Sequence, residues 1–245
     1  MFIAALLDEE HKIIMDWSAK AGSVLAVTMF FRHMGVLEEA MRYDRWVHRY
    51  RTKVFMRKHR VHDAHLEDGA YFKFKIVRNP YSRAVSSYIF AMRTGYADEE
   101  IRTVLHKEPY DMSFADYVAF LKATDIATCN IHHRRQKKEY EFQSAGVFDF
   151  VCRLERIEPD IETVNRMSGA GFSLHGLIRR SEHHAPIESG IEVNISNVPW
   201  SEIMKRGIPA YRNFYNPGLK RAVRSIYHDD IDTYGYRYDL DREET

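Results

Sequence analysis

The chain has 245 residues, of which 45% are hydrophobic and 29% are charged, and its 36 Lys and Arg nearly balance its 35 Asp and Glu. A chain of this length and composition can bury a core without disulfides or a structural metal. The formal net charge of +1 argues against bulk nucleic-acid binding, which requires a broad basic surface. Any binding of anions must therefore be local.

The cysteines and the apolar segments indicate the cellular compartment in which the protein is expected. Cys129 and Cys152 are the only cysteines; they allow at most one disulfide and form no CxxC pair. Residues 1–7 are apolar but are followed at once by three acidic residues, unlike a signal peptide. No run approaches the roughly 18–20 apolar residues of a membrane span. We expect one cytoplasmic domain, residues 1–245, with no integral membrane segment.

The first predicted unit is a strand over residues 12–17, a small-residue turn over 18–23 and a helix over 24–31. Small residues in such a turn let backbone N–H groups converge on an anion, and the helix adds the positive end of its dipole. The turn is not a Walker A loop, because Lys20 precedes Gly22. By itself the turn fits a plain tight turn with an exposed lysine better than a phosphate-binding loop.

A polar segment over residues 38–66 interleaves arginines with aromatic residues, most densely over 42–60. We interpret it as a solvated helical face with aromatic residues packed beneath it. A binding patch for an anionic partner is the alternative.

The second predicted unit is a strand over residues 71–77, a turn over 78–83 and a helix over 84–92, with Pro80 in the first helical turn. Arg78 stands at the end of this strand, and hydroxyls such as that of Ser86 lie in the first turns of the helix. The planar guanidinium of arginine suits a phosphate, although Arg78 could equally anchor an ion pair.

Further elements are predicted along the rest of the chain: helices over 113–121, with Ser113 as N-cap, over 158–168 and over 217–234, and a strand over 149–154. Strands that alternate with helices predict an α/β fold with a central, mostly parallel sheet flanked by helices on both faces. Ligands of such folds bind at the carboxyl ends of the strands, where both turns lie.

Two anion-binding turns point to a ligand with two phosphate groups. The second reads Ile-Val-Arg78-Asn-Pro-Tyr-Ser-Arg-Ala-Val-Ser86-Ser-Tyr88, and the first reads Ser-Ala-Lys20-Ala-Gly-Ser-Val24. Both resemble the nucleotide-binding segments of sulfotransferases of the carbohydrate type (sulfotransferase family 2), which use 3′-phosphoadenosine 5′-phosphosulfate (PAPS). In that family the first segment holds the 5′-phosphosulfate and the second holds the 3′-phosphate.

Three more stretches, residues 130–136, 148–158 and 226–236, resemble the same family in the same order, so the resemblance spans residues 12–236. The chain departs from the family pattern at four positions. Ala19 stands for the usual proline, Val24 for a threonine, His133 for a tryptophan and Arg135 for a proline. The loss of the threonine hydroxyl removes one expected phosphate ligand.

The resemblance implies a three-layer, P-loop-like fold and transfer of a sulfuryl group from PAPS to a hydroxyl of a carbohydrate or glycolipid acceptor, with PAP as the product and no metal. Lys20 would stabilise the leaving phosphate as charge develops on it. The residues expected to hold the nucleotide are Lys20, Ala21, Gly22, Ser23, Val24, Arg78 and Ser86.

A histidine is expected to act as the base for the acceptor hydroxyl, because an imidazole titrates near neutral pH. His132 ranks first, since it occupies the histidine of the family's Asn-x-His stretch. His133, His59 and His62 stay open as alternatives. Three groups of neighbouring histidines occur along the chain: residues 59, 62 and 65, residues 132 and 133, and residues 183 and 184.

Three alternative functions compete with this interpretation. A small-molecule kinase is disfavoured, because it would require a Walker-type loop and magnesium. A catalytically degenerate homologue that binds a nucleotide remains open, as does a binding protein for an anionic partner. The acceptor itself is not readable from the sequence, because acceptor pockets are built from variable loops, here residues 39–66, 93–112 and 170–216. The basic and aromatic content of 42–60 suggests an anionic or sugar-like acceptor as a hypothesis.

Overall fold

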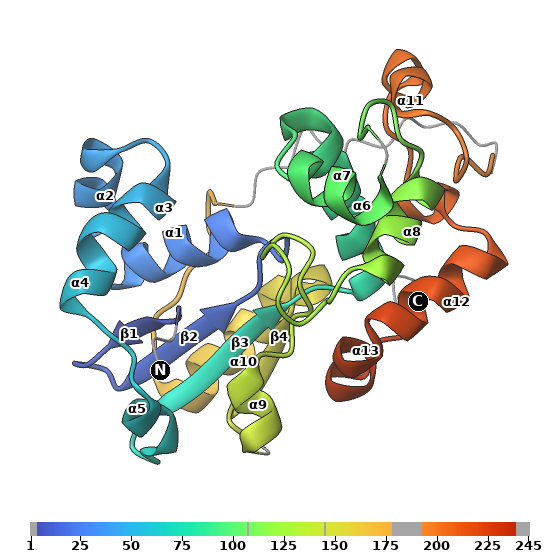
Figure 1. The fold of residues 1–245 in the computed structure, drawn as a ribbon. Coiled ribbons are helices and arrows are strands. Elements are labelled where there is room, and N and C mark those ends of the chain that lie inside the picture. The colour runs from blue at the N-terminus through green and yellow to red at the C-terminus, as the bar shows by residue number, and fades with distance from the viewer. Residues whose placement is uncertain (1–3, 107, 145, 178–192, 239–245) are drawn as a thin grey trace. The chain divides into compact units, whose positions relative to one another are not determined.

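The computed structural model describes residues 4–106, 108–144, 146–177 and 193–238 (Figure 1). The chain divides into two compact units. Unit 1 comprises Met1–Arg78 and Gln136–Arg179, and unit 2 comprises Asn79–Arg135 and Arg180–Thr245. The single domain expected from the sequence stays a prediction.

Unit 1 is built on a four-stranded sheet in the order β1-β2-β3-β4. The strands are β1 (Leu6–Asp8), β2 (Ile13–Trp17), β3 (Phe72–Val77) and β4 (Phe150–Arg153). β2, β3 and β4 run parallel, whereas β1 pairs antiparallel with β2. The mostly parallel sheet is therefore confirmed, and β1 is an edge strand that the sequence did not predict.

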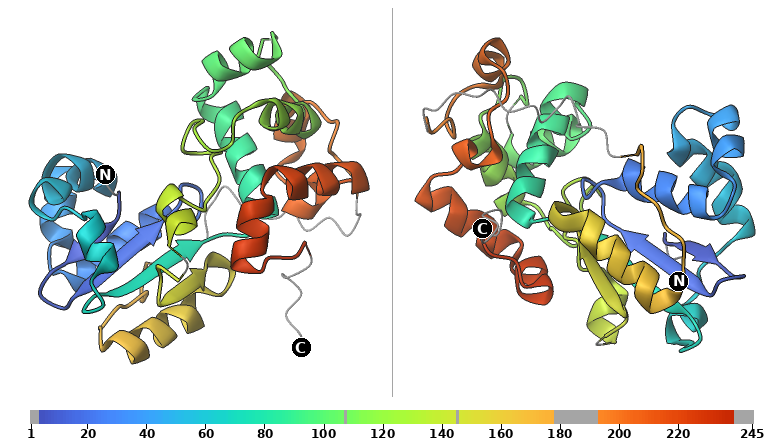
Figure 2. Two further views of the ribbon diagram at one scale, coloured as in Figure 1. Left: turned by 60° about the horizontal axis from the view of Figure 1, so that its bottom comes forward. Right: turned by 180° about the vertical axis from the view of Figure 1, so that it is seen from behind.

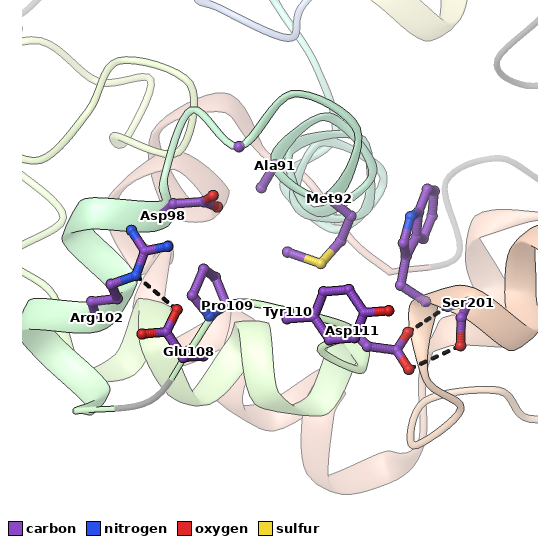
Figure 3. A pocket seen from close by; sticks show the side chains of 11 residues that line it. Ala91, Met92, Asp98, Arg102, Glu108, Pro109, Tyr110, Asp111 and Ser201 are labelled. Atoms are coloured by element: carbon purple, nitrogen blue, oxygen red, sulfur yellow. Dashed lines mark hydrogen bonds and ion pairs between the residues drawn. The ribbon is translucent and has the colours of Figure 1, made fainter.

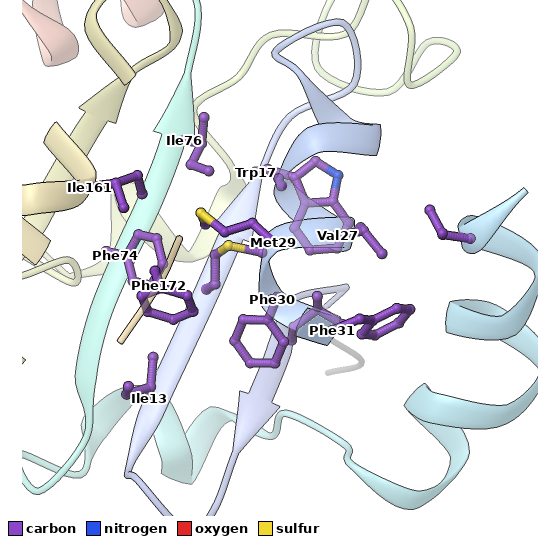
Figure 4. Close-up of a cluster of buried hydrophobic side chains, with 14 of the residues drawn as sticks. Ile13, Trp17, Val27, Met29, Phe30, Phe31, Phe74, Ile76, Ile161 and Phe172 are labelled. Atoms are coloured by element: carbon purple, nitrogen blue, oxygen red, sulfur yellow. The ribbon is translucent and has the colours of Figure 1, made fainter. Parts of the chain in front are cut away.

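One face of the sheet is covered by α1 (Ser23–His33) and α10 (Ile157–Ser168), as the views in Figure 2 show. Alternate strand residues such as Met15 and Phe74 point into this face. They pack against the aromatic side chains of Phe30 and Phe172 in the larger hydrophobic core (Figure 4). Both helices were predicted, within one residue at every boundary except the C-terminus of α1.

The opposite face carries a smaller core that includes Ile14, Val61 and Tyr140. The short helices α5 (Asp63–Glu67) and α9 (Glu139–Gln143) lie on this side. Helices therefore flank the sheet on both faces, as the alternation of strands and helices predicts.

The polar segment after α1 forms α2 (Leu37–Tyr43), α3 (Val47–Tyr50), a π-helical turn (Arg51–Phe55) and α4 (Met56–Lys58). Its aromatic residues divide into two groups. Tyr50 and Phe55 are buried against Phe31 of α1, whereas Tyr43 and Trp46 are 52% and 60% exposed. The predicted packing beneath a polar face therefore holds for only part of the segment.

Unit 2 is helical. Its helices are α6 (Pro80–Thr94), α7 (Asp98–Leu105), α8 (Phe114–Ala123), α11 (Trp200–Arg206), α12 (Pro217–Ile226) and α13 (His228–Tyr234). The predicted Ser113 cap of α8 is confirmed: Ser113 Oγ accepts from the N–H of Asp116, whose carboxylate accepts from the N–H of Ser113.

The single helix predicted over 217–234 is wrong, because the chain breaks at Tyr227 between α12 and α13. The predicted end at Gly235 holds, with φ of +64° at this glycine. The sequence missed α7, α9 and α11, each of eight residues or fewer. Among the residues that the structure describes, no helix is long and apolar enough to cross a bilayer.

Candidate functional site

The turn after β2 reverses the chain through two left-handed residues. Lys20 has φ of +65° and Gly22 has φ of +74°. Ala21 is fully buried, and its N–H donates to the carbonyl of Ser18 at 3.1 Å. A side chain at Gly22 would be strained by the positive φ and would place its Cβ 2.6 Å from Leu154 Cδ1. These features explain the small residues of this turn.

The turn opens into the N-terminus of α1 without a side-chain cap. The N-cap residue of α1 is Gly22, and among the described residues no side chain hydrogen-bonds to the free N–H groups of this helix end. The first turn of α1 contains no acidic residue. The backbone N–H groups and the helix dipole therefore present positive charge at Ser23 and Val24, and Val24 is 53% exposed. This local arrangement is suited to a phosphate.

Arg78 approaches the same turn from the neighbouring strand. It follows β3, and its Nη1 donates to the carbonyl oxygen of Lys20 at 3.2 Å. The carboxyl ends of two parallel strands meet here, as the topology predicts. The two predicted anion-binding turns thus bring Lys20 and Arg78 together within unit 1.

Gln136 holds the backbone of Arg78 in place. Its Oε1 accepts from the N–H of Arg78 at 2.9 Å, and its Nε2 donates to the carbonyl of Arg78 at 2.8 Å. Gln136 is fully buried, and its own carbonyl accepts from Lys75 Nζ at 2.7 Å. The sequence reasoning missed this role, although the glutamine closes the 130–136 stretch of the family resemblance.

A buried ionic cluster supports the ends of β2 and β3. Asp16 pairs with Lys138 and lies 3.6 Å from Lys75, which also pairs with Glu141, and Tyr140 donates to Asp16 at 2.6 Å. Burial alone would raise the pKa of Asp16, but the two lysines and these hydrogen bonds outweigh it and lower the pKa. The charges balance, so the cluster is a structural support for the turn.

Ser86, the other predicted nucleotide ligand, belongs to unit 2. It lies in α6, whose N-cap is Asn79, and Asn79 Oδ1 accepts from the N–H of Tyr81 at 3.0 Å. Pro80 takes the first helical position, as predicted, but the helix spans Pro80–Thr94 and so begins four residues before the predicted start at residue 84. Ser86 itself is only 5% exposed. Its hydroxyl is therefore largely covered by the packing of unit 2.

His132 is held in one tautomer. Asn130 Oδ1 accepts from the backbone N–H of His132 at 3.1 Å and lies 2.9 Å from His132 Nδ1. Because this oxygen can only accept, Nδ1 must carry the proton, and Nε2 of the neutral ring carries the lone pair. The ring packs against Phe90 and Tyr96, with centroids 4.9 and 4.7 Å away. This tautomer suits a general base.

The other candidate histidines have structural surroundings. His133 is fully buried, and burial lowers its pKa. His59 stacks on Phe55 at 4.5 Å. His62 caps α5, where its N–H donates to His65 Nδ1 at 3.0 Å, and α5 leads into the amino end of β3, away from Lys20. The predicted histidine group at 183 and 184 lies outside the described residues.

Unit 2 also contains a pocket of about 480 Å³ between the end of α6, α7, residues 108–111 and α11 (Figure 3). Two aromatic residues, Tyr110 and Trp200, line it together with Asp98 and Asp111. Asp111 Oδ2 accepts from the hydroxyl of Ser201 at 2.9 Å. The lining draws on two of the segments, 93–112 and 170–216, that the sequence predicted to form the acceptor site.

Comparison with known proteins agrees with this geometry. The sequence matches the family model described as "Sulfotransferase family" over residues 5–237. No curated protein and no solved structure matches it. The family match covers nearly the whole chain, including the turn at Lys20, the Arg78 segment and the Gln136 stretch, and the chain therefore belongs to the sulfotransferase family.

Proposed function

We propose that this sulfotransferase moves a sulfuryl group from PAPS to a hydroxyl of a carbohydrate or glycolipid. The observation that carries the proposal is the contact of Arg78 Nη1 with the carbonyl of Lys20, 3.2 Å apart. It brings two cationic residues to the uncapped N-terminus of α1. Backbone N–H donors, a lysine and an arginine fork together form a donor set for phosphate oxygens.

The residues of unit 1 fit the nucleotide in chemistry. Bound there, PAPS supplies the activated sulfuryl group. The N–H groups of Ser23 and Val24 would bind a phosphate, and Lys20 would donate to the bridging oxygen as negative charge develops on it. Arg78, whose backbone Gln136 holds in position, would bind the 3′-phosphate. Val24 has no hydroxyl to donate to the phosphate, so the backbone N–H groups of the turn would supply more of its hydrogen bonds than the side chains do.

We propose His132 as the base. Asn130 fixes the Nδ1–H tautomer, so Nε2 can accept the proton of an acceptor hydroxyl. His132 belongs to unit 2, and its assigned role is supported by this tautomer and by the family resemblance. The role of Ser86 as a phosphate ligand stays a prediction, because its side chain is almost fully buried.

The pocket of unit 2 supports a neutral sugar as the acceptor. Its acidic residues Asp98, Glu108 and Asp111 outnumber its one arginine, Arg102, which Glu108 neutralises at 2.9 Å. Carboxylates accept hydrogen bonds from sugar hydroxyls, and they repel anionic groups. The exposed ring of Tyr110 adds an apolar face for a sugar ring.

The cysteines support the proposed location. Cys129 and Cys152 are both buried free thiols. We propose that the protein works in a reducing compartment, the cytoplasm.

Incubation with sulfur-labelled PAPS and a panel of neutral oligosaccharides, glycolipids and anionic polysaccharides tests the proposed function. The expected result is labelled product together with PAP. Lys20→Met should lose activity by about 10²–10³-fold, while Lys53→Met, which removes an exposed lysine, should keep it. PAP binding without transfer to any acceptor would instead identify a catalytically degenerate homologue.

A further inference from the structure

Three side chains of kinds that bind metals, a glutamate, a cysteine and a histidine, lie close together within unit 2. Glu100 comes from α7, and Cys129 and His133 come from the segment after α8. One ligand atom of each, a carboxylate oxygen, Sγ and a ring nitrogen, lies within 4.8 Å of the other two. Cys129 and His133 are buried, and the Glu100 side chain is 28% exposed.

The separation of His133 Nε2 and Glu100 Oε2 is close to that of two neighbouring ligand atoms on a four-coordinate divalent cation. In a tetrahedral zinc site with bonds of about 2.0–2.3 Å, neighbouring ligand atoms lie about 3.3–3.8 Å apart. His133 Nε2 lies 3.2 Å from Glu100 Oε2. A thiolate, an imidazole and a carboxylate are ligands that Zn²⁺ accepts together.

The imidazole of His133 has an unsatisfied nitrogen that points to a ligand. The residue is fully buried, yet among the described residues Nε2 has no hydrogen-bond partner of acceptable geometry, although Glu100 is close. A buried polar atom in this state is costly, and a metal bound along its lone pair would satisfy it.

The opposite side of the ring is already supported. His133 Nδ1 lies 3.2 Å from the hydroxyl of Tyr96, which in turn lies 2.8 Å from Ser87 Oγ. Histidines that bind metals through one nitrogen usually donate a hydrogen bond from the other, which fixes the ring. Tyr96 can accept that hydrogen bond and donate onward to Ser87.

We propose that Glu100, Cys129 and His133 bind one Zn²⁺ ion, with the fourth position open to water on the exposed side of Glu100. Binding releases the Cys129 thiol proton to solvent, and the two anionic ligands then balance the charge of the ion. The ion would tie α7 to the segment that carries His132. This site goes beyond the proposed transfer reaction, which does not use it.

A second cluster, Asp8, His11 and His33 of unit 1, serves as an internal comparison. Here both imidazoles already hydrogen-bond to Asp8 Oδ2, at 2.8 and 3.1 Å. The two nitrogens that face Asp8 therefore already have a partner, unlike His133 Nε2.

Titration of the metal-stripped full chain with Co²⁺ tests the zinc site, because thiolate ligation produces a charge-transfer absorption that carboxylates and imidazoles do not. We expect one equivalent of Co²⁺ to produce this absorption and Zn²⁺ to displace it. Cys129→Ala should abolish the absorption and Glu100→Gln should weaken affinity at least tenfold, while His11→Asn should leave both unchanged.

Two outcomes would overturn the zinc site. One is the absence of the absorption in the wild-type protein at saturating Co²⁺, a result that does not depend on any variant folding. The other is an absorption that survives Cys129→Ala and disappears in Cys152→Ala, the matched variant of the other buried thiol. Neither readout involves PAPS, so failure here is separate from failure of the proposed function.

Discussion

The carboxamide of Gln136 pairs with both backbone polar groups of Arg78, accepting from its N–H at 2.9 Å and donating to its carbonyl at 2.8 Å. A side chain thus takes the place of a neighbouring strand just beyond the end of β3. The clamp sets the direction in which the arginine leaves the sheet. It links a buried residue without charge to the arginine whose Nη1 donates to the carbonyl of Lys20.

Gln136→Leu should destabilise the protein by about 2 kcal/mol, because it leaves the N–H and the carbonyl of Arg78 without their partners. Urea denaturation measures this loss, and Gln143→Leu, at an exposed glutamine, is the matched control. Equal midpoints for the two variants would show that the clamp contributes nothing to stability.

Val24→Thr should strengthen PAP binding by about tenfold. The side chain lies in the first turn of α1 and is 53% exposed, so a hydroxyl there can reach a bound phosphate, and a hydrogen bond to a charged group contributes about 1.5–3 kcal/mol. Val193→Thr, at a valine that is 49% exposed in unit 2, controls for the substitution itself. Unchanged affinity in calorimetry would place the phosphate elsewhere.

At position 20, glycine should give a more stable protein than alanine, which is the reverse of their usual order in a helix. The φ of +65° at Lys20 is strained for any residue with a Cβ, so Lys20→Gly should be more stable than Lys20→Ala by about 1 kcal/mol. At Lys122, in the exposed face of α8, alanine should instead be the more stable by about 1 kcal/mol. Thermal melts of the four variants decide this. If alanine were the more stable replacement at both Lys20 and Lys122, the backbone at Lys20 would not be strained.

Acid should destabilise the protein through His48. Burial, with a smaller contribution from Arg51, lowers the pKa of this imidazole to about 4. The unfolded chain takes up the proton near pH 6.5, so the stabilising contribution is complete above pH 6.5 and is lost as the pH falls toward 4, by at most about 3 kcal/mol.

His48→Leu should flatten this loss in urea denaturation between pH 7 and pH 4. His228→Leu, at an exposed histidine, should keep it. A pH dependence that is identical in both variants would mean that His48 is not the group responsible.

Tyr110→Ala should raise the KM for a neutral sugar acceptor several-fold and leave PAP affinity unchanged. The ring is 87% exposed at the edge of the pocket in unit 2, so its loss removes contact area and disturbs little of the core. Tyr43→Ala, at an exposed tyrosine of α2, is the control. Steady-state kinetics with unchanged KM in both variants would exclude the pocket as the acceptor site.

The sequence predicted those parts of the fold that depend on local patterns. The β-branched and aromatic runs of β2 and β3 were found, and so was the Ser113 capping box, because their signals lie within a few residues. The meeting of Lys20 with Arg78 also followed from the rule that parallel strands end at one edge.

Other features depend on contacts distant in the chain. The break between α12 and α13 falls at Tyr227, which is buried and donates its hydroxyl to the carbonyl of His133 at 2.7 Å. No local signal marks this tertiary contact. The role of Gln136 was missed for the same reason, since its partner Arg78 is 58 residues away. β1 exists only through its pairing with β2.

Isothermal titration with PAP is the most direct test of the central claim, that Lys20 and Arg78 form a nucleotide phosphate site. We predict micromolar binding by the wild-type protein, reduced at least tenfold in Arg78→Ala and in Lys20→Ala. Arg57→Ala, at an exposed arginine of α4, should bind like the wild type. Absence of PAP binding by the folded wild-type protein would contradict the account.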